Sequence, residues 1–262
     1  MKPAIVWDMA EQGSDAWLAA RKGIVTGSMA KYARMRLKTG EWAKAALDYA
    51  RDLARERCGG TPAPVFVNAA MRTGQDQEPV ARMRYEARTG EIVEEVGFCH
   101  TSDRRFGCSV DGLVFPPGGV EIKCMVSSAT LFQALVSGDV SEYRDQCLMA
   151  MWLLGLQWMD VVLWCPDLDL LRIIRIDRDE AEIDAFAADM QAFESVVQGL
   201  ANDLAAIMKA NTDAGMWTEL DAEPDATAPV ETVDTLHALT MDELNPAPAR
   251  TAVAPDAIPE LF

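Results

Sequence analysis

The feature of this sequence that most constrains its fold is a Pro-Pro-Gly-Gly turn at residues 116–119 with an acidic residue on either side. Such a turn predicts a β-hairpin, and the Val-Glu-Ile-Lys-Cys run that follows it predicts a short buried strand. Because side chains alternate along a strand, Glu121 and Lys123 should share one face while Ile122 faces the core. Asp111 ends the preceding strand, so the hairpin can bring both carboxylates within reach of one cation.

Two carboxylates and a lysine around one hairpin are the minimal set for metal-assisted cleavage of a phosphodiester. Oxygen ligands with no histidine close in sequence favour Mg²⁺ or Mn²⁺. The hairpin alone leaves an alternative open, because Asp-Gly is a common turn dipeptide and a Glu/Lys pair on a strand is often a solvated surface. The sequence around the hairpin bears on this choice.

Three blocks of sequence occur in a fixed order along the chain. The first, residues 11–28, contains a Trp, an Arg-Lys-Gly and a Thr-Gly-Ser. The second comprises residues 74–78 and 85–90 and leads to the hairpin, and the third begins with Tyr-Arg-Asp-Gln at 143–146 and continues through an apolar stretch. In this order the chain resembles the lambda-type exonucleases, also called YqaJ-type viral recombinases, within the PD-(D/E)xK nucleases.

The resemblance implies an α+β fold with a restriction-endonuclease-like core, a mixed central β-sheet flanked by helices. It also implies a metal-dependent 5′-to-3′ exonuclease that acts on linear double-stranded DNA ends and leaves 3′ overhangs for phage-type recombination by strand annealing. Mg²⁺ would be the cofactor, replaceable by Mn²⁺, a single-strand annealing protein the partner, and a ring-shaped homotrimer the assembly. Two alternatives remain: a structure- or site-specific endonuclease with the same hairpin, and a non-catalytic acidic interaction protein that retains the fold.

The resemblance gives each residue of the hairpin a role. Asp111, Glu121 and the backbone carbonyl of Ile122 would bind the metal, and Lys123 would position or activate the attacking water and stabilise charge in the transition state. Glu78 matches the family's additional acidic residue, either a second metal ligand or a water holder. Since Glu78 is expected near a helix N-terminus, it could instead be a first-turn glutamate that offsets the helix dipole.

Gln146 and three further residues complete the expected site. Gln146 should lie at the border between core and active site, where water or the scissile phosphate could be its partner, unless it is a capping or core-edge glutamine. Arg21, Ser28 and Ser109 match the residues that hold the 5′-terminal phosphate in this family, a role that suits the arginine fork. Ser28 could instead be a helix cap. Trp17 is most simply a core residue.

The net charge of −17 is unusual for a protein that binds DNA, but it is unevenly distributed. Residues 213–262 hold eleven acidic residues and one arginine, whereas residues 21–57 hold ten basic and four acidic residues. A local basic lobe would attract DNA to one face and leave the rest of the surface repulsive. For Arg51, Arg55 and Arg57, decoration of a solvated helix is an equally good explanation.

The periodicity of apolar residues and the positions of Gly and Pro predict the elements. Pro79 is expected in the first turn of its helix, which Gly90 ends. The strands before residue 125 should form an antiparallel meander. The expected helices are 14–22, a short one after Thr26 or Ser28, 42–57, 75–88, 142–154 and 179–210, and the expected strands are 92–99, 106–114, 119–124, 159–165 and 170–176.

The composition changes after Trp217, which predicts an exonuclease domain over residues 1–217 and an acidic, disordered C-terminal tail over 218–262. A short helix is expected at 232–244. The apolar-acidic segment 255–262 could bind a single-stranded-DNA-binding protein or another partner, or the tail could simply promote solubility.

No apolar run approaches the roughly eighteen residues that a membrane span needs, and the start of the sequence has no signal peptide, so a cytoplasmic protein of a bacterial host or phage is expected. The six cysteines are scattered without a C-x-x-C pair. This spacing argues against a zinc or iron–sulfur site and favours buried thiols in a reducing compartment.

Overall fold

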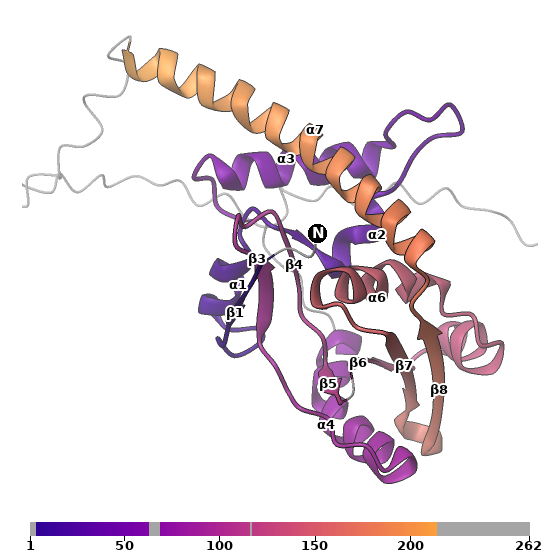
Figure 1. Cartoon of the computed structure of the whole chain (residues 1–262). Helices are drawn as coiled ribbons and strands as arrows, with labels where there is room; N and C mark the ends of the chain where they lie inside the picture. The colour runs from indigo at the N-terminus through magenta and orange to yellow at the C-terminus, as the bar shows by residue number, and fades with distance from the viewer. Residues whose placement is uncertain (1–3, 63–68, 116, 214–262) are drawn as a thin grey trace, which may run out of the picture. The chain divides into compact units, whose positions relative to one another are not determined.

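The computed structural model describes residues 4–62, 69–115 and 117–213, and Figure 1 shows the course of the chain. Two four-stranded mixed sheets are surrounded by helices. The elements are β1 (Ile5–Asp8), α1 (Asp15–Arg21), β2 (Val25–Thr26), η1 (Gly27–Met29), α2 (Ala30–Ala33), α3 (Lys44–Arg57), α4 (Ala69–Thr89), β3 (Phe98–Thr101), β4 (Phe106–Cys108), β5 (Gly112–Val114), β6 (Gly118–Cys124), α5 (Ser128–Thr130), η2 (Leu131–Val136), α6 (Ser141–Leu154), β7 (Trp158–Cys165), η3 (Pro166–Leu168), β8 (Leu170–Asp177) and α7 (Glu180–Asp213).

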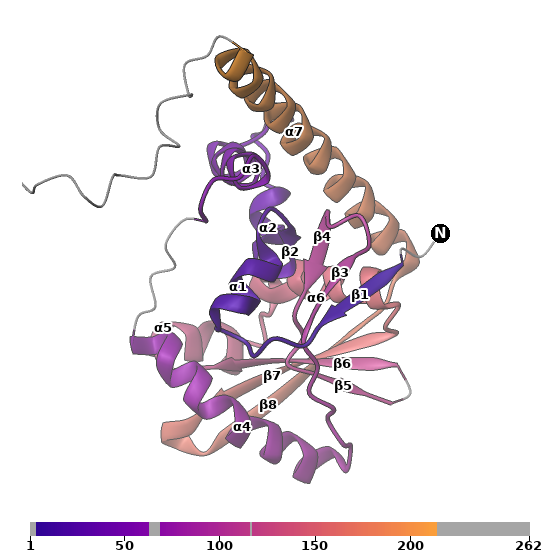
Figure 2. The same ribbon diagram turned by 90° about the vertical axis from the view of Figure 1, so that its left-hand side faces the viewer.

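The sheet that carries the predicted hairpin has the strand order β5-β6-β7-β8. Its strands β6 and β7 are parallel, whereas β5 and β8 run antiparallel to their neighbours. Helices α4 and α6 cover its two faces (Figure 2). The side chains of β7 therefore alternate between these two faces. Val161 and Leu163 join the larger core with α6, while Val162 joins the smaller core with α4.

The other sheet, in the order β1-β3-β4-β2, holds the short parallel pair β2 and β4. Because parallel strands end at the same edge of a sheet, the residues that follow β2 and β4 are brought together. Gly27 opens η1 directly after β2, and a Cβ there would lie 3.4 Å from the Cys108 Cβ, so the two strand ends pack closely. Ser28 and Ser109, the residues that follow Gly27 and Cys108, therefore lie at the same edge of the sheet.

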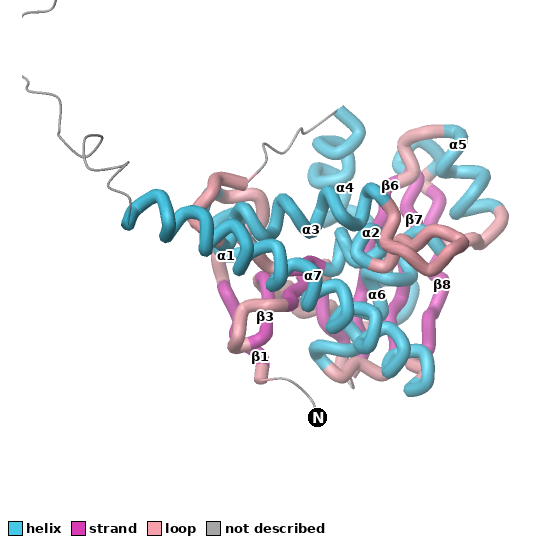
Figure 3. Tube along the Cα trace, turned by 90° about the horizontal axis from the view of Figure 1, so that it is seen from above, coloured by secondary structure: helices cyan, strands magenta, loops and turns pink. Residues whose placement is uncertain are grey.

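Helix α6 is the centre of the larger core, since nearly all residues from Cys147 to Leu153 are buried. Gly155 ends it in a left-handed conformation (φ 71°) and donates a 3.0 Å hydrogen bond to the Met151 carbonyl. Helices α3 and α7 lie side by side (Figure 3), where the Tyr49 ring stacks on Phe193 at 5.5 Å between centroids. The expected α+β architecture with mixed sheets flanked by helices is confirmed.

Two expectations about the elements are wrong. Helix α4 begins before residue 75, so Pro79 lies in its interior and Glu78 is remote from its N-terminus. The expected meander is also interrupted: within 92–99 only an isolated bridge at Glu94 precedes β3, and the strand expected over 106–114 divides into β4 and β5, which belong to different sheets. The division arises because residues 109–111 cross from one sheet to the other.

Other expectations agree with the structure or fall outside it. All six cysteines are free thiols, four of them buried. Within the described residues, no helix is both long and apolar enough to span a membrane. The predictions for residues 218–262, including the helix at 232–244, lie outside the described residues.

Candidate active site

A single cavity brings the predicted site residues together. Its volume is about 410 Å³, and it lies where α1 and η1 face β6, α4 and α6. All nine residues proposed from the sequence contribute to its walls: Arg21, Ser28, Glu78, Ser109, Asp111, Glu121, Ile122, Lys123 and Gln146. Gln12, Trp17 and Gln75 also line it.

Asp111 is held by the backbone of the opposite strand. It lies in the crossover just before β5, where its N–H donates to the Val120 carbonyl at 3.1 Å. Its Oδ2 accepts a 2.6 Å hydrogen bond from the Ile122 N–H. The carboxylate is thereby fixed beside β6, as the hairpin predicts.

Glu121, Lys123 and Gln146 form one hydrogen-bonded cluster. Glu121 is 2% exposed, and its Oε1 accepts a 2.6 Å hydrogen bond from Gln146 Nε2 and lies 2.7 Å from Lys123 Nζ. Lys123 Nζ is also 3.5 Å from Gln146 Oε1 and 5.4 Å from the centre of the Tyr143 ring. The expected sharing of one face by Glu121 and Lys123 is confirmed, and Gln146 lies within α6 at the core border.

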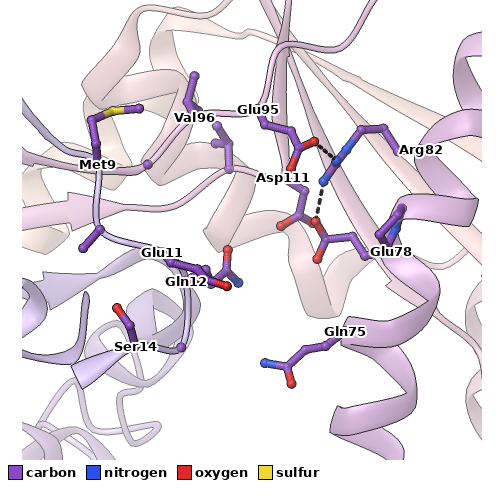
Figure 4. A pocket seen from close by; sticks show the side chains of 15 residues that line it. Met9, Glu11, Gln12, Ser14, Gln75, Glu78, Arg82, Glu95, Val96 and Asp111 are labelled. Atoms are coloured by element: carbon purple, nitrogen blue, oxygen red, sulfur yellow. Dashed lines mark hydrogen bonds and ion pairs between the residues drawn. The ribbon is translucent and has the colours of Figure 1, made fainter. Parts of the chain in front are cut away.

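Glu78 reaches the cavity from the middle of α4, as Figure 4 shows. Its Oε1 accepts a 2.7 Å hydrogen bond from Arg82 one turn later. Arg82 also pairs with Glu95 at 2.5 Å. The alternative of a first-turn glutamate that offsets the helix dipole is therefore wrong for Glu78.

The acidic groups perturb one another's pKa values. Burial, followed by the neighbouring Asp111 and Glu78 carboxylates, raises the pKa of Glu121 to about 8 despite the opposing effect of Lys123. Burial and then Asp111 raise the pKa of Glu78 to about 7. Burial also raises the pKa of Asp111. The pKa of Lys123 is raised as well: burial would lower it, but Glu121 and Asp111 together outweigh that effect.

The donor set suits a hard divalent cation. Among the described residues, no three His, Cys, Asp or Glu side chains are arranged as a ready-made metal centre, and Lys123 and Arg82 contact the carboxylates of Glu121 and Glu78. Nevertheless, three mutually repelling carboxylates line one cavity, and a bound cation would offset that repulsion. Their oxygens are the ligands that Mg²⁺ prefers.

Arg21, Ser28 and Ser109 form a separate corner of the cavity. The Arg21 guanidinium stacks 4.0 Å from the centre of the Trp17 ring, and its NH2 lies 3.4 Å from Ser28 Oγ. Burial lowers the Arg21 pKa. Ser109 Oγ is buried without a hydrogen-bond partner among the described residues. Trp17 is partly buried against the small core of Ala20, Ile24 and Phe98, which agrees with the expected core role, and its ring also contacts Arg21.

Two further cavities adjoin this one. The larger, about 920 Å³, shares Gln75, Glu78 and Asp111 with it and is drawn in Figure 4. The smaller, about 220 Å³, shares Ser28, Lys123 and Gln146 with it. The predicted residues therefore lie at the junction of a longer concave surface, to which sequence reasoning did not assign Arg82 or Tyr143. Arg82 could have been identified from its spacing, because it lies four residues after Glu78 on one helix.

The arginines of the basic lobe are largely engaged in ion pairs. Arg57 donates two hydrogen bonds, of 2.6 and 2.8 Å, to the buried Glu194 carboxylate. Arg51 pairs with Asp48 at 2.9 Å and Arg55 with Asp52 at 3.8 Å, both within α3. For these three arginines the structure supports a role in packing and helix stability.

Comparisons with known proteins identify relatives of this chain. The model of the YqaJ-like viral recombinase domain matches residues 16–157. The crystal structure of LHK-Exo, an alkaline exonuclease from Laribacter hongkongensis, is 34% identical, with a TM-score of 0.66 over 75% of this chain and 99% of that chain. The structure of LHK-Exo in complex with dAMP is 33% identical, with a TM-score of 0.64 over 78% and 99% of the two chains.

A phage-related exonuclease from Haemophilus somnus 129PT shares the fold at 14% identity, with a TM-score of 0.56 over 71% of this chain and 96% of that one. No curated protein sequence matches the chain. The family model nevertheless covers more than half of the sequence, and LHK-Exo is matched over almost its whole length. The chain therefore belongs to the YqaJ-like viral recombinase family.

Proposed function

We propose that this protein is a Mg²⁺-dependent exonuclease that degrades one strand of linear duplex DNA from its 5′ end and leaves a 3′ overhang. One observation carries the proposal: a single cavity holds Asp111, Glu121 and Lys123 beside Arg21, Ser28 and Ser109. A site for hydrolysis thus adjoins a site suited to a terminal phosphate. LHK-Exo is an alkaline exonuclease that has also been solved in complex with dAMP, which supports this choice of substrate.

Asp111, Glu121, the Ile122 carbonyl and Glu78 would hold the metal ions. A bound Mg²⁺ would supply Lewis-acid stabilisation of charge on the phosphate oxygens. Lys123 holds its ammonium group 2.7 Å from Glu121, where it can orient the attacking water and balance developing negative charge. Gln146 fixes the Glu121 carboxylate through a 2.6 Å hydrogen bond, so that carboxylate is oriented before substrate binds.

The other corner of the cavity would bind the 5′-terminal phosphate. Arg21 offers a planar donor set pre-oriented by Trp17, and Ser109 offers a buried hydroxyl that lacks a partner among the described residues. A phosphate would satisfy this hydroxyl and pair with the guanidinium. Terminal binding of this kind would favour removal of nucleotides from an end over cutting within a duplex.

The experiment is a time course on a linear duplex with one 5′-phosphorylated end, with Mg²⁺, with Mn²⁺ and with a chelator. We expect loss of the phosphorylated strand from its 5′ end, retention of the complementary strand and no reaction with the chelator. A covalently closed circular duplex is the control for endonuclease activity. Cleavage of the circle would favour a site-specific endonuclease, and absence of hydrolysis with either metal would favour a non-catalytic protein.

The same proposal extends to partners. Duplex DNA ends would be the substrate, and a single-strand annealing protein would take up the 3′ overhang. A ring-shaped homotrimer would enclose the duplex and make digestion processive. Sedimentation in the presence and absence of DNA measures the oligomeric state directly.

A further inference from the structure

Arg82 lies beside the proposed metal site but binds no proposed substrate group. It is the only cation among the described residues that line the 920 Å³ cavity, which is also lined by the acidic residues Glu11, Glu78, Glu95 and Asp111. Arg82 itself is 9% exposed. A buried guanidinium is costly unless its partners fix it, so its contacts indicate what it does.

The guanidinium joins two elements of the structure. Its NH2 is 2.7 Å from Glu78 Oε1 within α4, and its NH1 is 2.5 Å from Glu95 Oε1 in the segment between α4 and β3. Figure 4 shows both contacts next to Asp111. Glu95 is 72% exposed, so its carboxylate reaches inward to Arg82 from the surface.

This arrangement opposes a repulsion between like charges. Glu78 and Asp111 line the same two cavities, and Glu121 lies in the wall of the smaller of the two. Lys123 compensates Glu121 on β6, whereas Glu78 lies on helix α4 and receives its compensation from Arg82. Without Arg82, a half-buried glutamate on a helix would turn toward solvent and away from Asp111.

We propose that Arg82 is a positioning residue, which holds the Glu78 carboxylate toward Asp111 and is itself anchored by Glu95. The inference rests on the proposed function, in which Glu78 serves phosphodiester cleavage. Arg82 contacts Glu78 directly, whereas Asp111 feels only its charge, so the effect of Arg82 on catalysis should largely disappear when Glu78 can no longer act. This dependence separates positioning from a general contribution to folding.

A double-mutant cycle tests the dependence. Arg82→Met should lower kcat on linear duplex by about 10- to 100-fold, the loss expected from a small displacement of a site group, with KM for DNA unchanged. Arg82→Lys should restore part of kcat. In the Glu78→Gln background, Arg82→Met should cause no further loss. Arg84→Met is the matched control, because Arg84 lies on the same helix, pairs with Asp169 at 2.8 Å and lines none of the three cavities.

Losses that add in the double variant, or a raised KM with unchanged kcat, would overturn the proposal. A calorimetric titration with Mn²⁺ in the absence of DNA gives a second readout. Arg82→Met should weaken Mn²⁺ binding as Glu78→Gln does, and tighter binding would show that Arg82 only opposes the cation. If the wild-type protein cleaves no DNA, the proposed function fails, while this titration still tests Arg82.

Glu95→Ala covers the case in which Arg82→Met does not fold. This change leaves Arg82 and Glu78 in place and removes only the surface anchor. It should lower kcat in the same direction by a smaller factor, again with no effect in the Glu78→Gln background. Wild-type kcat in Glu95→Ala would contradict the anchoring role.

Discussion

At the scale of single residues, each carboxylate of the site has its own partner, a cation for Glu121 and Glu78 and a backbone N–H for Asp111. Lys123 contacts Glu121, and Arg82 contacts Glu78, while Asp111 is satisfied by the backbone N–H of Ile122. A buried carboxylate without such a partner would take up a proton. The arrangement therefore keeps acidic oxygens in the cavity, where they could also bind a metal ion. The charge of that ion would offset the carboxylates together with Lys123 and Arg82.

Lys123→Ala should abolish hydrolysis, as should Asp111→Ala and Glu121→Ala. Removal of one preorganised charge that stabilises the transition state costs about 100- to 1,000-fold in kcat. Circular dichroism should show that the variants remain folded, and Lys209→Ala, at an exposed position of α7 outside the basic lobe, serves as the control. Near-wild-type digestion of linear duplex by folded Lys123→Ala would show that this hairpin is not the active site.

The raised pKa values predict how the stability of the metal-free protein depends on pH. In the folded protein the pKa of Glu78 is about 7 and that of Glu121 about 8, compared with an ordinary value of 4.5. The folded state thus binds protons more tightly than the unfolded state. The stability that this binding contributes is fully present below the ordinary pKa and is lost as the pH rises through the folded pKa values of about 7 and 8. We expect the free energy of unfolding to fall by on the order of 2 kcal/mol from these groups.

Urea denaturation in the presence of a chelator, at pH 5.5 and pH 9, measures this loss. Glu121→Gln carries no titratable group at this position, so its stability should fall less than that of the wild type over the same range. Parallel changes in the two proteins would mean that Glu121 ionises normally.

Arg21→Ala should reduce the preference for a 5′-phosphate over a 5′-hydroxyl end. A charge-assisted bidentate contact contributes roughly 1.5 to 3 kcal/mol, which corresponds to about 10- to 100-fold in rate or affinity. The stacking on Trp17 holds the guanidinium for this contact. Rates on the two kinds of end give the ratio, and equal ratios in wild type and variant would remove Arg21 from the phosphate pocket.

At the scale of elements, helix α4 lacks one backbone hydrogen bond beside the site. Pro79 lies inside the helix and has no N–H to donate to the Gln75 carbonyl, and both Gln75 and Glu78 line the active cavity. Pro79→Ala restores a donor and should stabilise the protein by about 1 to 3 kcal/mol. The denaturation midpoint measures this change, and a lower midpoint would show that packing of the Pro79 ring outweighs the missing hydrogen bond.

The sequence predicts element types well where one local pattern dominates. The alternation around Ile122 appears as expected, and the expected helix at 14–22 is capped by Ser14, whose hydroxyl accepts a 3.2 Å hydrogen bond from Trp17 N–H. The split of β4 from β5 could not be predicted, because both halves are apolar and only tertiary pairing assigns them to different sheets. The early start of α4 likewise escaped prediction, since Gly74 and Pro79 suggest a helix boundary where packing continues the helix.

The same division applies to the site. Its nine residues were found from motif order, and the structure gathers all of them in one cavity. Their partners, however, depend on folding: the contact of Arg82 with Glu95 and that of Gln146 with Glu121 join residues far apart or on separate elements. No local pattern specifies these two contacts. The contact between Glu78 and Arg82 differs, because their i, i+4 spacing on one helix does predict it.

At the scale of the whole molecule, the two sheets supply different parts of the site. The ends of β2 and β4 supply Ser28 and Ser109, and the other sheet supplies Asp111, Glu121 and Lys123. Helices α1, α4 and α6 then add Arg21, Glu78 and Gln146. The crossover at residues 109–111 is what joins the phosphate corner to the metal corner.

The last prediction concerns residues 218–262. All nine site residues lie between 21 and 146, and the C-terminal segment from residue 213 carries eleven acidic residues against one arginine. Such a charge repels the DNA backbone, so the segment should not contribute to binding of naked DNA. Truncation after Trp217 should leave digestion of linear duplex unchanged and weaken association with an annealing protein or a single-stranded-DNA-binding protein. Digestion rates and pull-down of both partners measure the two effects. Loss of hydrolysis would show that these residues support the nuclease domain, and undiminished pull-down would show that they recruit neither partner.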